Sequence, residues 1–124
     1  MAVPELWTLG VFRSMKNHDH AIEMLTNVLK CLATHSGDAR ERVAVAYQCC
    51  SHMMPQELPE PCRKDWAWIK KEVTKFGPLT DYKGDVWRGS VENTMKTVRK
   101  STGEKIAKKF YALYWAVSKN RPYA

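Results

Sequence analysis

The fold is indicated most clearly by the stretch "CRKDWAWIKKEVTKF", residues 62–76, in which apolar side chains recur at the period of an α-helix. The apolar positions are Cys62, Trp66, Ile69, Val73 and Phe76, at intervals of 4, 3, 4 and 3 residues. Side chains with this spacing lie along one face of a helix, and we expect that face to be buried in a core. The Gly-Pro pair at positions 77 and 78 should end the helix.

Five further segments carry helical patterns, which makes six in all. Their expected starts are Pro4 for the first, the N-caps Asn17, Asp38 and Ser90 for the second, third and fifth, and a capping box of Ser101 and Glu104 for the sixth. Their expected inward positions are Leu6, Leu9 and Phe12; Ile22, Leu25, Leu29 and Leu32; Val43, Tyr47, Cys50 and Met54; Val91, Met95 and Val98; and Ile106, Phe110, Leu113 and Val117.

Residues 78–89, "PLTDYKGDVWRG", carry no helical period, and no part of the chain shows sustained strand alternation. We expect this stretch to be irregular and to be held to the body of the protein by Trp87. The sequence therefore predicts an all-α protein, in which residues 1–124 form one compact domain, a bundle of about five or six helices.

Positive charge is concentrated in the second half of the chain. The formal net charge is +7, but residues 1–62 carry five Lys/Arg against seven Asp/Glu, whereas residues 63–124 carry fifteen against six. Segregated charge of one sign favours an anionic partner for the second half. The alternative is that basic helices keep a small protein soluble.

Trp68 raises a question of its own, because it lies off the core stripe that contains Trp66. On a helix it would lie with Lys64, Lys71 and Lys75, and Lys108, Tyr111, Trp115 and Lys119 form a similar stripe near the C-terminus. Lysines neutralise phosphates and aromatic rings stack on bases, so these stripes suit nucleic acid. Each tryptophan could equally belong to a second packing face or anchor a protein interface.

From these patterns we predict a surface that contacts nucleic acid or another partner. Its candidate residues are Lys64, Trp68, Lys71, Lys75, Lys96, Arg99, Lys100, Lys105, Lys108, Lys109, Tyr111, Trp115 and Lys119. A helix-turn-helix is a weaker possibility, in which "KSTGEK" would be the turn and Gly103 would begin the recognition helix.

The sequence matches no motif for metal binding or catalysis. Cys49, His52 and Cys62 are weak candidates for a metal site, with Cys50 or His35 as a fourth ligand, but their spacing fits no zinc motif. The four cysteines are expected to be reduced and buried. Phosphate-binding loops and hydrolase motifs are missing, so we expect no metal, no cofactor and no enzymatic activity.

The leading hypothesis is a non-enzymatic, cytoplasmic interaction protein. Its basic C-terminal half would contact an RNA or DNA backbone, or the anionic surface of a larger ribonucleoprotein or protein assembly, as an accessory subunit. The alternative is an inhibitor or adaptor that binds a protein through Trp68 and Trp115 with a basic rim. The third hypothesis is an enzyme whose active site matches no known sequence motif. The chain has no apolar run of membrane-spanning length, so no membrane is expected among its partners.

Overall fold

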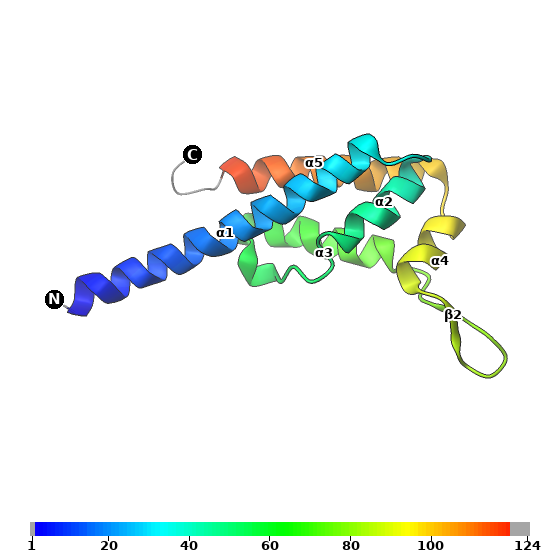
Figure 1. Cartoon of the computed structure of the whole chain (residues 1–124), viewed down its shortest axis with the longest axis horizontal. Coiled ribbons are helices and arrows are strands. Elements are labelled where there is room, and N and C mark those ends of the chain that lie inside the picture. The colour runs from blue at the N-terminus through cyan, green and yellow to red at the C-terminus, as the bar shows by residue number, and fades with distance from the viewer. Residues whose placement is uncertain (1, 120–124) are drawn as a thin grey trace.

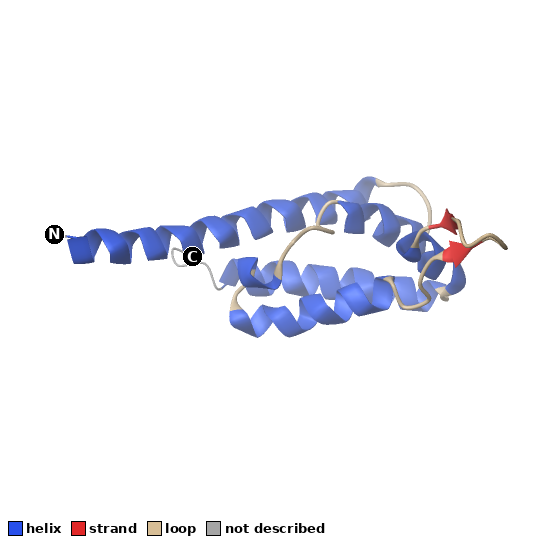
Figure 2. Cartoon of the chain, turned by 90° about the horizontal axis from the view of Figure 1, so that it is seen from below, coloured by secondary structure: helices blue, strands red, loops and turns tan. Residues whose placement is uncertain are grey.

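The computed structural model describes residues 2–119, with side chains from residue 18 onward, and is a helical bundle with one small hairpin (Figures 1 and 2). The elements are α1 (Ala2–Thr34), α2 (Ala39–Gln48), the single 3₁₀ turns η1 (Pro55–Glu57) and η2 (Glu60–Cys62), α3 (Arg63–Val73), β1 (Leu79–Thr80), β2 (Val86–Arg88), α4 (Ser90–Thr97) and α5 (Lys100–Lys119). The prediction of an all-α bundle of about five or six helices is confirmed.

The long helices α1 and α5 run along the length of the molecule, and the shorter helices complete the bundle around them (Figure 1). Helices α1, α2 and α5 all contact one another, and α3 packs against α5. The N-terminal end of α1 extends beyond the other helices at one end of the molecule, and the hairpin of β1 and β2 projects at the other (Figures 1 and 2).

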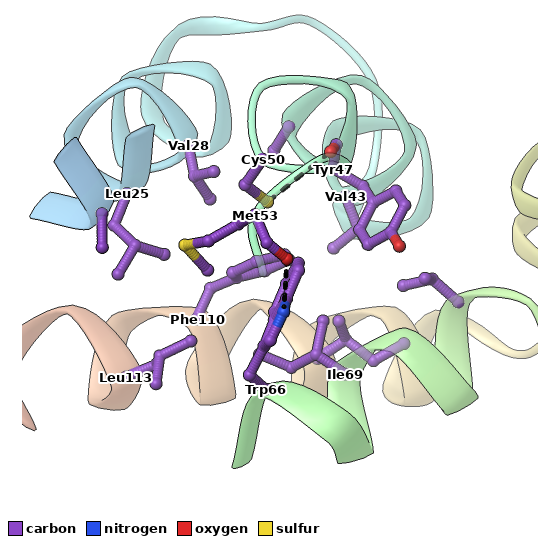
Figure 3. Packing of buried hydrophobic residues seen from close by; sticks show 14 of the residues in the cluster. Leu25, Val28, Val43, Tyr47, Cys50, Met53, Trp66, Ile69, Phe110 and Leu113 are labelled. Carbon is purple, nitrogen blue, oxygen red and sulfur yellow. Dashed lines mark hydrogen bonds between the residues drawn. The ribbon is translucent and has the colours of Figure 1, made fainter. Parts of the chain in front are cut away.

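The core forms where the apolar stripes of α1, α2, α3 and α5 meet (Figure 3). Trp66 lies at its centre, fully buried, with its ring stacked on Tyr47 at 5.9 Å between centroids. Its indole Nε1 donates a hydrogen bond of 3.0 Å to the carbonyl oxygen of Met53, which satisfies the one polar atom of the side chain. The predicted inward positions of the last helix, Ile106, Phe110, Leu113 and Val117, are all fully buried.

Two sequence predictions about the N-terminal half were wrong. The first two expected helices are one continuous helix, α1, so Asn17 lies inside it rather than at a cap. Polar residues alone do not end a helix, and the stretch around Asn17 contains neither proline nor glycine to break it. The expected inward positions Leu6, Leu9 and Phe12 lie outside the residues with described side chains.

Two expected core side chains are instead half exposed, because their helices end early. Helix α2 ends at Gln48, so the helical phase that pointed to Met54 is lost and Met53 is buried in its place. Helix α3 ends at Val73, four residues after Ile69, and Phe76 leaves the core with the turn that follows.

The capping predictions had mixed outcomes. Asp38 caps α2 as predicted, since its side chain accepts hydrogen bonds from the backbone N–H of Arg40 and Glu41. Gly89, not Ser90, is the N-cap of α4. Helix α5 already begins at Lys100, so Ser101 is a helical residue rather than the cap of a capping box.

Gly103 is therefore not in a turn, and the helix-turn-helix prediction was wrong. It lies inside α5, buried, where that helix crosses the start of α2. A Cβ atom at Gly103 would lie 2.8 Å from the backbone nitrogen of Arg40. The glycine is needed for the close approach of two helix backbones.

Candidate nucleic-acid interface

The stretch predicted to be irregular contains a short antiparallel hairpin, in which Leu79 pairs with Arg88 and Thr80 with Val86. Its turn is closed by a hydrogen bond of 3.0 Å from Gly84 N to the carbonyl oxygen of Asp81 and one of 2.9 Å from Asp81 N to that of Asp85. Gly84 has a φ of 87°, a conformation that favours glycine. The glycine within "DYKGD" was the available sequence signal for this hairpin.

The carboxylate of Asp81 also belongs to the turn. Its Oδ1 accepts hydrogen bonds from Lys83 N at 2.8 Å and from Asp85 N at 3.0 Å. This acidic side chain therefore has a structural role within the turn, as Asp side chains commonly do.

Two side chains of α4 fix the base of the hairpin. Thr94, which is fully buried, accepts a hydrogen bond of 3.1 Å at Oγ1 from the backbone N–H of Phe76. The side-chain amide of Asn93 donates a hydrogen bond of 3.0 Å to the carbonyl oxygen of Gly77. The hairpin thus projects from the bundle in a defined direction.

The hairpin exposes large aromatic side chains on a projecting element. Tyr82 is 93% exposed, Trp87 is 73% exposed and Val86 is 64% exposed. Successive residues of a strand point to opposite faces, so the exposure of both Val86 and Trp87 means that neither face is packed on the bundle. The prediction that Trp87 holds this stretch to the body was wrong.

A cation lies over each exposed ring. Lys83 Nζ lies 5.6 Å from the centroid of the Tyr82 ring, and the guanidinium carbon of Arg88 lies 5.2 Å from that of the Trp87 ring. These pairs combine a flat apolar surface with positive charge on one small element. Such a combination suits a ligand that is both aromatic and anionic.

Helix α3 presents a basic face that leads into the hairpin. Lys64 and Lys71 are seven residues apart and lie on one side of α3, and Lys75 follows in the turn just after the helix ends at Val73; all three are exposed. Lys75 is followed by Phe76, which is 50% exposed, and β1 begins at Leu79. The basic face and the aromatic hairpin are therefore neighbours along the chain.

Trp68 occupies the seam between α3 and α5. It is half-buried and packs against the edge of the core, with Lys109 Nζ 5.4 Å from its ring centroid. The same Nζ lies 3.6 Å from Oδ1 of Asp65. Lys105 is one turn before Lys109 on this side of α5. Trp68 therefore contributes to a second packing face of α3.

The aromatic residues of the predicted stripe on α5 lie on a different side of that helix. Trp115 meets Tyr111 and Tyr114 edge to face, with centroid distances of 6.2 and 5.6 Å. Beside them is a groove of about 420 Å³ between α1 and α5, lined by Leu29, Leu32, Ala33, Ala107, Lys108 and Tyr111. Lys119 is exposed, one turn beyond Trp115.

The remaining candidate cations lie near the junction of α4 and α5. Lys96 Nζ is 3.3 Å from Glu92 Oε1, and its side chain borders a hollow shared with Glu41. Lys100 lines a second hollow with Asp38 and Glu104. Arg99 is exposed. The predicted residues are thus brought together in four groups rather than on one continuous face.

The metal candidates are dispersed. Cys62 is buried in the core, His52 is exposed, and the thiol of Cys49 lies beside that of Cys31. Within residues 18–119, no three His, Cys, Asp or Glu side chains are grouped as a metal ion would require. Burial raises the pKa of Cys50 to about 12, and it also raises the pKa of Cys62, so both thiols are protonated at neutral pH.

Comparison with known proteins gives no relative, since no family model, no curated protein sequence and no solved structure matches the chain. Among the helices of residues 2–119, none is both long enough and apolar enough to cross a lipid bilayer.

Proposed function

We propose that this protein is a non-enzymatic nucleic-acid-binding protein, which binds single strands through the hairpin and the basic face of α3. The observation that carries the proposal is the exposure of Tyr82 and Trp87, each with a cation over its ring, on an element fixed to the bundle at its base.

The exposed aromatic side chains of this hairpin, Tyr82 and Trp87, lie outside the hydrophobic core of the bundle. A hairpin of two strands without a packed face is marginally stable, and exposed tryptophan adds to the cost of hydrating apolar surface. Stacking of a base on an aromatic ring contributes about 1–3 kcal/mol and is tolerant of sequence. A bound base would therefore bury the apolar surface of Trp87 that the free protein exposes to water.

The lysines of α3 and of the turn that follows it supply the phosphate contacts in this proposal. A single strand of nucleic acid whose bases stack on the hairpin would continue past Lys75 to Lys71 and then to Lys64. Each of these lysines is exposed. Bases in a duplex are already stacked on one another, so the hairpin would favour single-stranded RNA or DNA. Four free cysteines suit a reducing compartment, and we propose that the protein acts in the cytoplasm, as an accessory subunit of a larger assembly.

The test is a titration of a labelled single-stranded oligonucleotide, followed by fluorescence anisotropy at about 50 mM salt, where electrostatic attraction is strong. The wild type should bind with a Kd of about 1–100 µM. Trp87→Ala should weaken binding about 5- to 150-fold, because a stacked base is lost. Trp115→Ala is the matched control, since Trp115 is 48% exposed but lies on α5, and its affinity should be unchanged.

Salt dependence tests the phosphate contacts separately. The slope of log affinity against log salt is about −0.7 per phosphate neutralised in a single strand, so Lys71→Gln with Lys75→Gln should make it shallower by about 1.4. A folded protein that binds no nucleic acid at about 50 mM salt would contradict the proposal.

A second function is favoured by the groove between α1 and α5. Its apolar lining continues into the exposed rings of Tyr111 and Trp115, and aromatic residues beside an apolar groove are typical of protein interfaces. In this alternative the chain is an inhibitor or adaptor of a protein partner. Trp115→Ala would then weaken partner binding, whereas Trp87→Ala would not.

A further inference from the structure

Two cysteines from different helices lie next to each other. Cys31 belongs to the last turns of α1, and Cys49 is the C-cap residue of α2. Their Sγ atoms are 3.6 Å apart, although 18 residues separate them in the sequence. Both cysteines are free and half-buried, so they remain partly accessible to solvent.

We propose that Cys31 and Cys49 are a site of reversible thiol oxidation, at which an intramolecular disulfide joins α1 to the end of α2. A disulfide requires a sulfur–sulfur distance of about 2.05 Å, so the two atoms must approach by about 1.5 Å. Rotation of the side chains can supply part of this movement. Cys49 is the C-cap residue of α2, and its backbone N–H donates to the carbonyl oxygens of Ala46 and Tyr47, so a small shift of the end of α2 against α1 must supply the rest.

The other two cysteines are excluded by their surroundings. Cys50 is 1% exposed, and its thiol donates to the carbonyl oxygen of Tyr47 at 3.5 Å. Cys62 is also 1% exposed, in the core. A bond between Cys49 and Cys50 would be strained, because the Cα atoms of neighbouring residues are about 3.8 Å apart and most disulfides need about 4.4–6.8 Å.

The oxidant in this proposal is a small-molecule disulfide of the glutathione class. One protein thiolate attacks a sulfur of the small disulfide, which forms a mixed disulfide and releases one small thiol. The second protein thiolate then attacks the protein sulfur of that mixed disulfide, which forms the bond between Cys31 and Cys49 and releases the second small thiol. The protein pair is oxidised by two electrons, the small disulfide is reduced by two, and the two protons are carried away on the released thiols.

The test uses the full chain, folded and at low micromolar concentration, incubated with excess oxidised glutathione at pH 8 and then alkylated. Two of the four thiols should become resistant to alkylation and be recovered on reduction. Trypsin cuts after Lys30, Arg40, Arg42 and Arg63, so the bond should link peptide 31–40 to peptide 43–63. Because the second peptide contains Cys49, Cys50 and Cys62, fragmentation of the linked pair in the mass spectrometer must place the bond at Cys49.

Variants give an independent assignment. Cys49→Ser should abolish the linked peptides, and Cys50→Ser, its neighbour in the chain, should retain them. The melting temperature of the oxidised wild type should rise by roughly 8–15 °C and return on reduction, because a loop of 18 residues is closed.

Three results would overturn the proposal. The first is a bond from Cys31 to Cys50 or Cys62. The second is glutathione attached to Cys31 and Cys49 without a bond between them. The third is a melting temperature that falls on oxidation, which would show that the folded bundle does not accommodate the bond.

Discussion

Trp66 in the bundle and Trp87 in the hairpin place the same side chain in opposite environments. Trp66 is fully buried, stacked on Tyr47 and hydrogen-bonded to the carbonyl oxygen of Met53, so both its ring and its polar atom have partners within the core (Figure 3). Trp87 is 73% exposed, with the guanidinium of Arg88 at its ring. The difference teaches that the bundle uses aromatic surface for folding, whereas the hairpin keeps it available for a partner.

The largest effect should separate these two tryptophans directly. Trp66→Ala should lower the free energy of unfolding by roughly 3–5 kcal/mol, as removal of a large core aromatic does. Trp87→Ala should change it by less than about 0.5 kcal/mol, as is usual for exposed positions. Urea unfolding followed by far-UV circular dichroism measures both. Similar losses for the two variants would mean that Trp87 packs on the bundle.

Gly103 tests how closely the helices of the bundle pack, in contrast to the unpacked hairpin. Replacing a helical glycine by alanine normally stabilises a helix by up to about 1 kcal/mol. Here the new Cβ would lie 2.8 Å from the backbone of Arg40, so Gly103→Ala should instead lower the free energy of unfolding by about 1–3 kcal/mol. Ser101→Ala, at an exposed position of the same helix, is the control and should be neutral or slightly stabilising. A stabilised Gly103→Ala protein would contradict the close helix contact.

The base of the hairpin tests whether the two regions are coupled. Thr94→Val removes the acceptor for the Phe76 amide, which should cost about 1–2 kcal/mol, because that N–H loses its partner at a half-buried site. Hydrogen exchange at Phe76 and Gly77 should accelerate, while exchange at Ile69 in the core should change only through the global loss of stability. Unchanged exchange at Phe76 would show that the hairpin is fixed by other contacts.

The smallest effect concerns the start of α2 and depends on pH. The hydrogen bonds from Arg40 to Asp38 lower the pKa of that carboxyl from 3.8 to about 2 in the folded protein. A lowered folded pKa adds stability above the unfolded value, and this stability is lost as the pH falls from about 4 through about 2. Asp38→Asn retains a capping side chain but has no charge. Its melting temperature should lie below that of the wild type at pH 6 and should approach it at pH 2. A constant difference across this range would argue against the ionised pair.

Much of the bundle could be predicted from the sequence, because helical periodicity reports which side of a helix is buried. The stripe containing Trp66 and that containing Phe110 were both recognisable, and both are buried except for Phe76 at the end of the first. Periodicity fails where a helix ends, since the phase is then lost. For this reason Met54 was predicted to be buried, whereas Met53 is buried in the structure. Phe76 was also predicted to be buried, although it lies beyond the end of α3.

The candidate site was less predictable, because it depends on contacts between distant segments. The basic face of α3 was apparent from the spacing of its lysines. No local pattern could tell that one side of α5 meets Trp68 through Lys109, or that another side borders α1. The exposure of Trp87 was equally hidden, since composition alone suggests that a tryptophan in a loop is packed.

The brevity of the hairpin has a further consequence for the behaviour of the protein at high concentration. A two-stranded ribbon has two open edges, and unpaired backbone groups along an edge can recruit the edge of another molecule. Here β1 spans Leu79–Thr80 and β2 spans Val86–Arg88, so each edge offers few such groups. Pro78 immediately before β1 has no N–H to donate, and the charged Arg88 ends β2. The ribbon can therefore display a tryptophan to solvent with little tendency to seed intermolecular sheets.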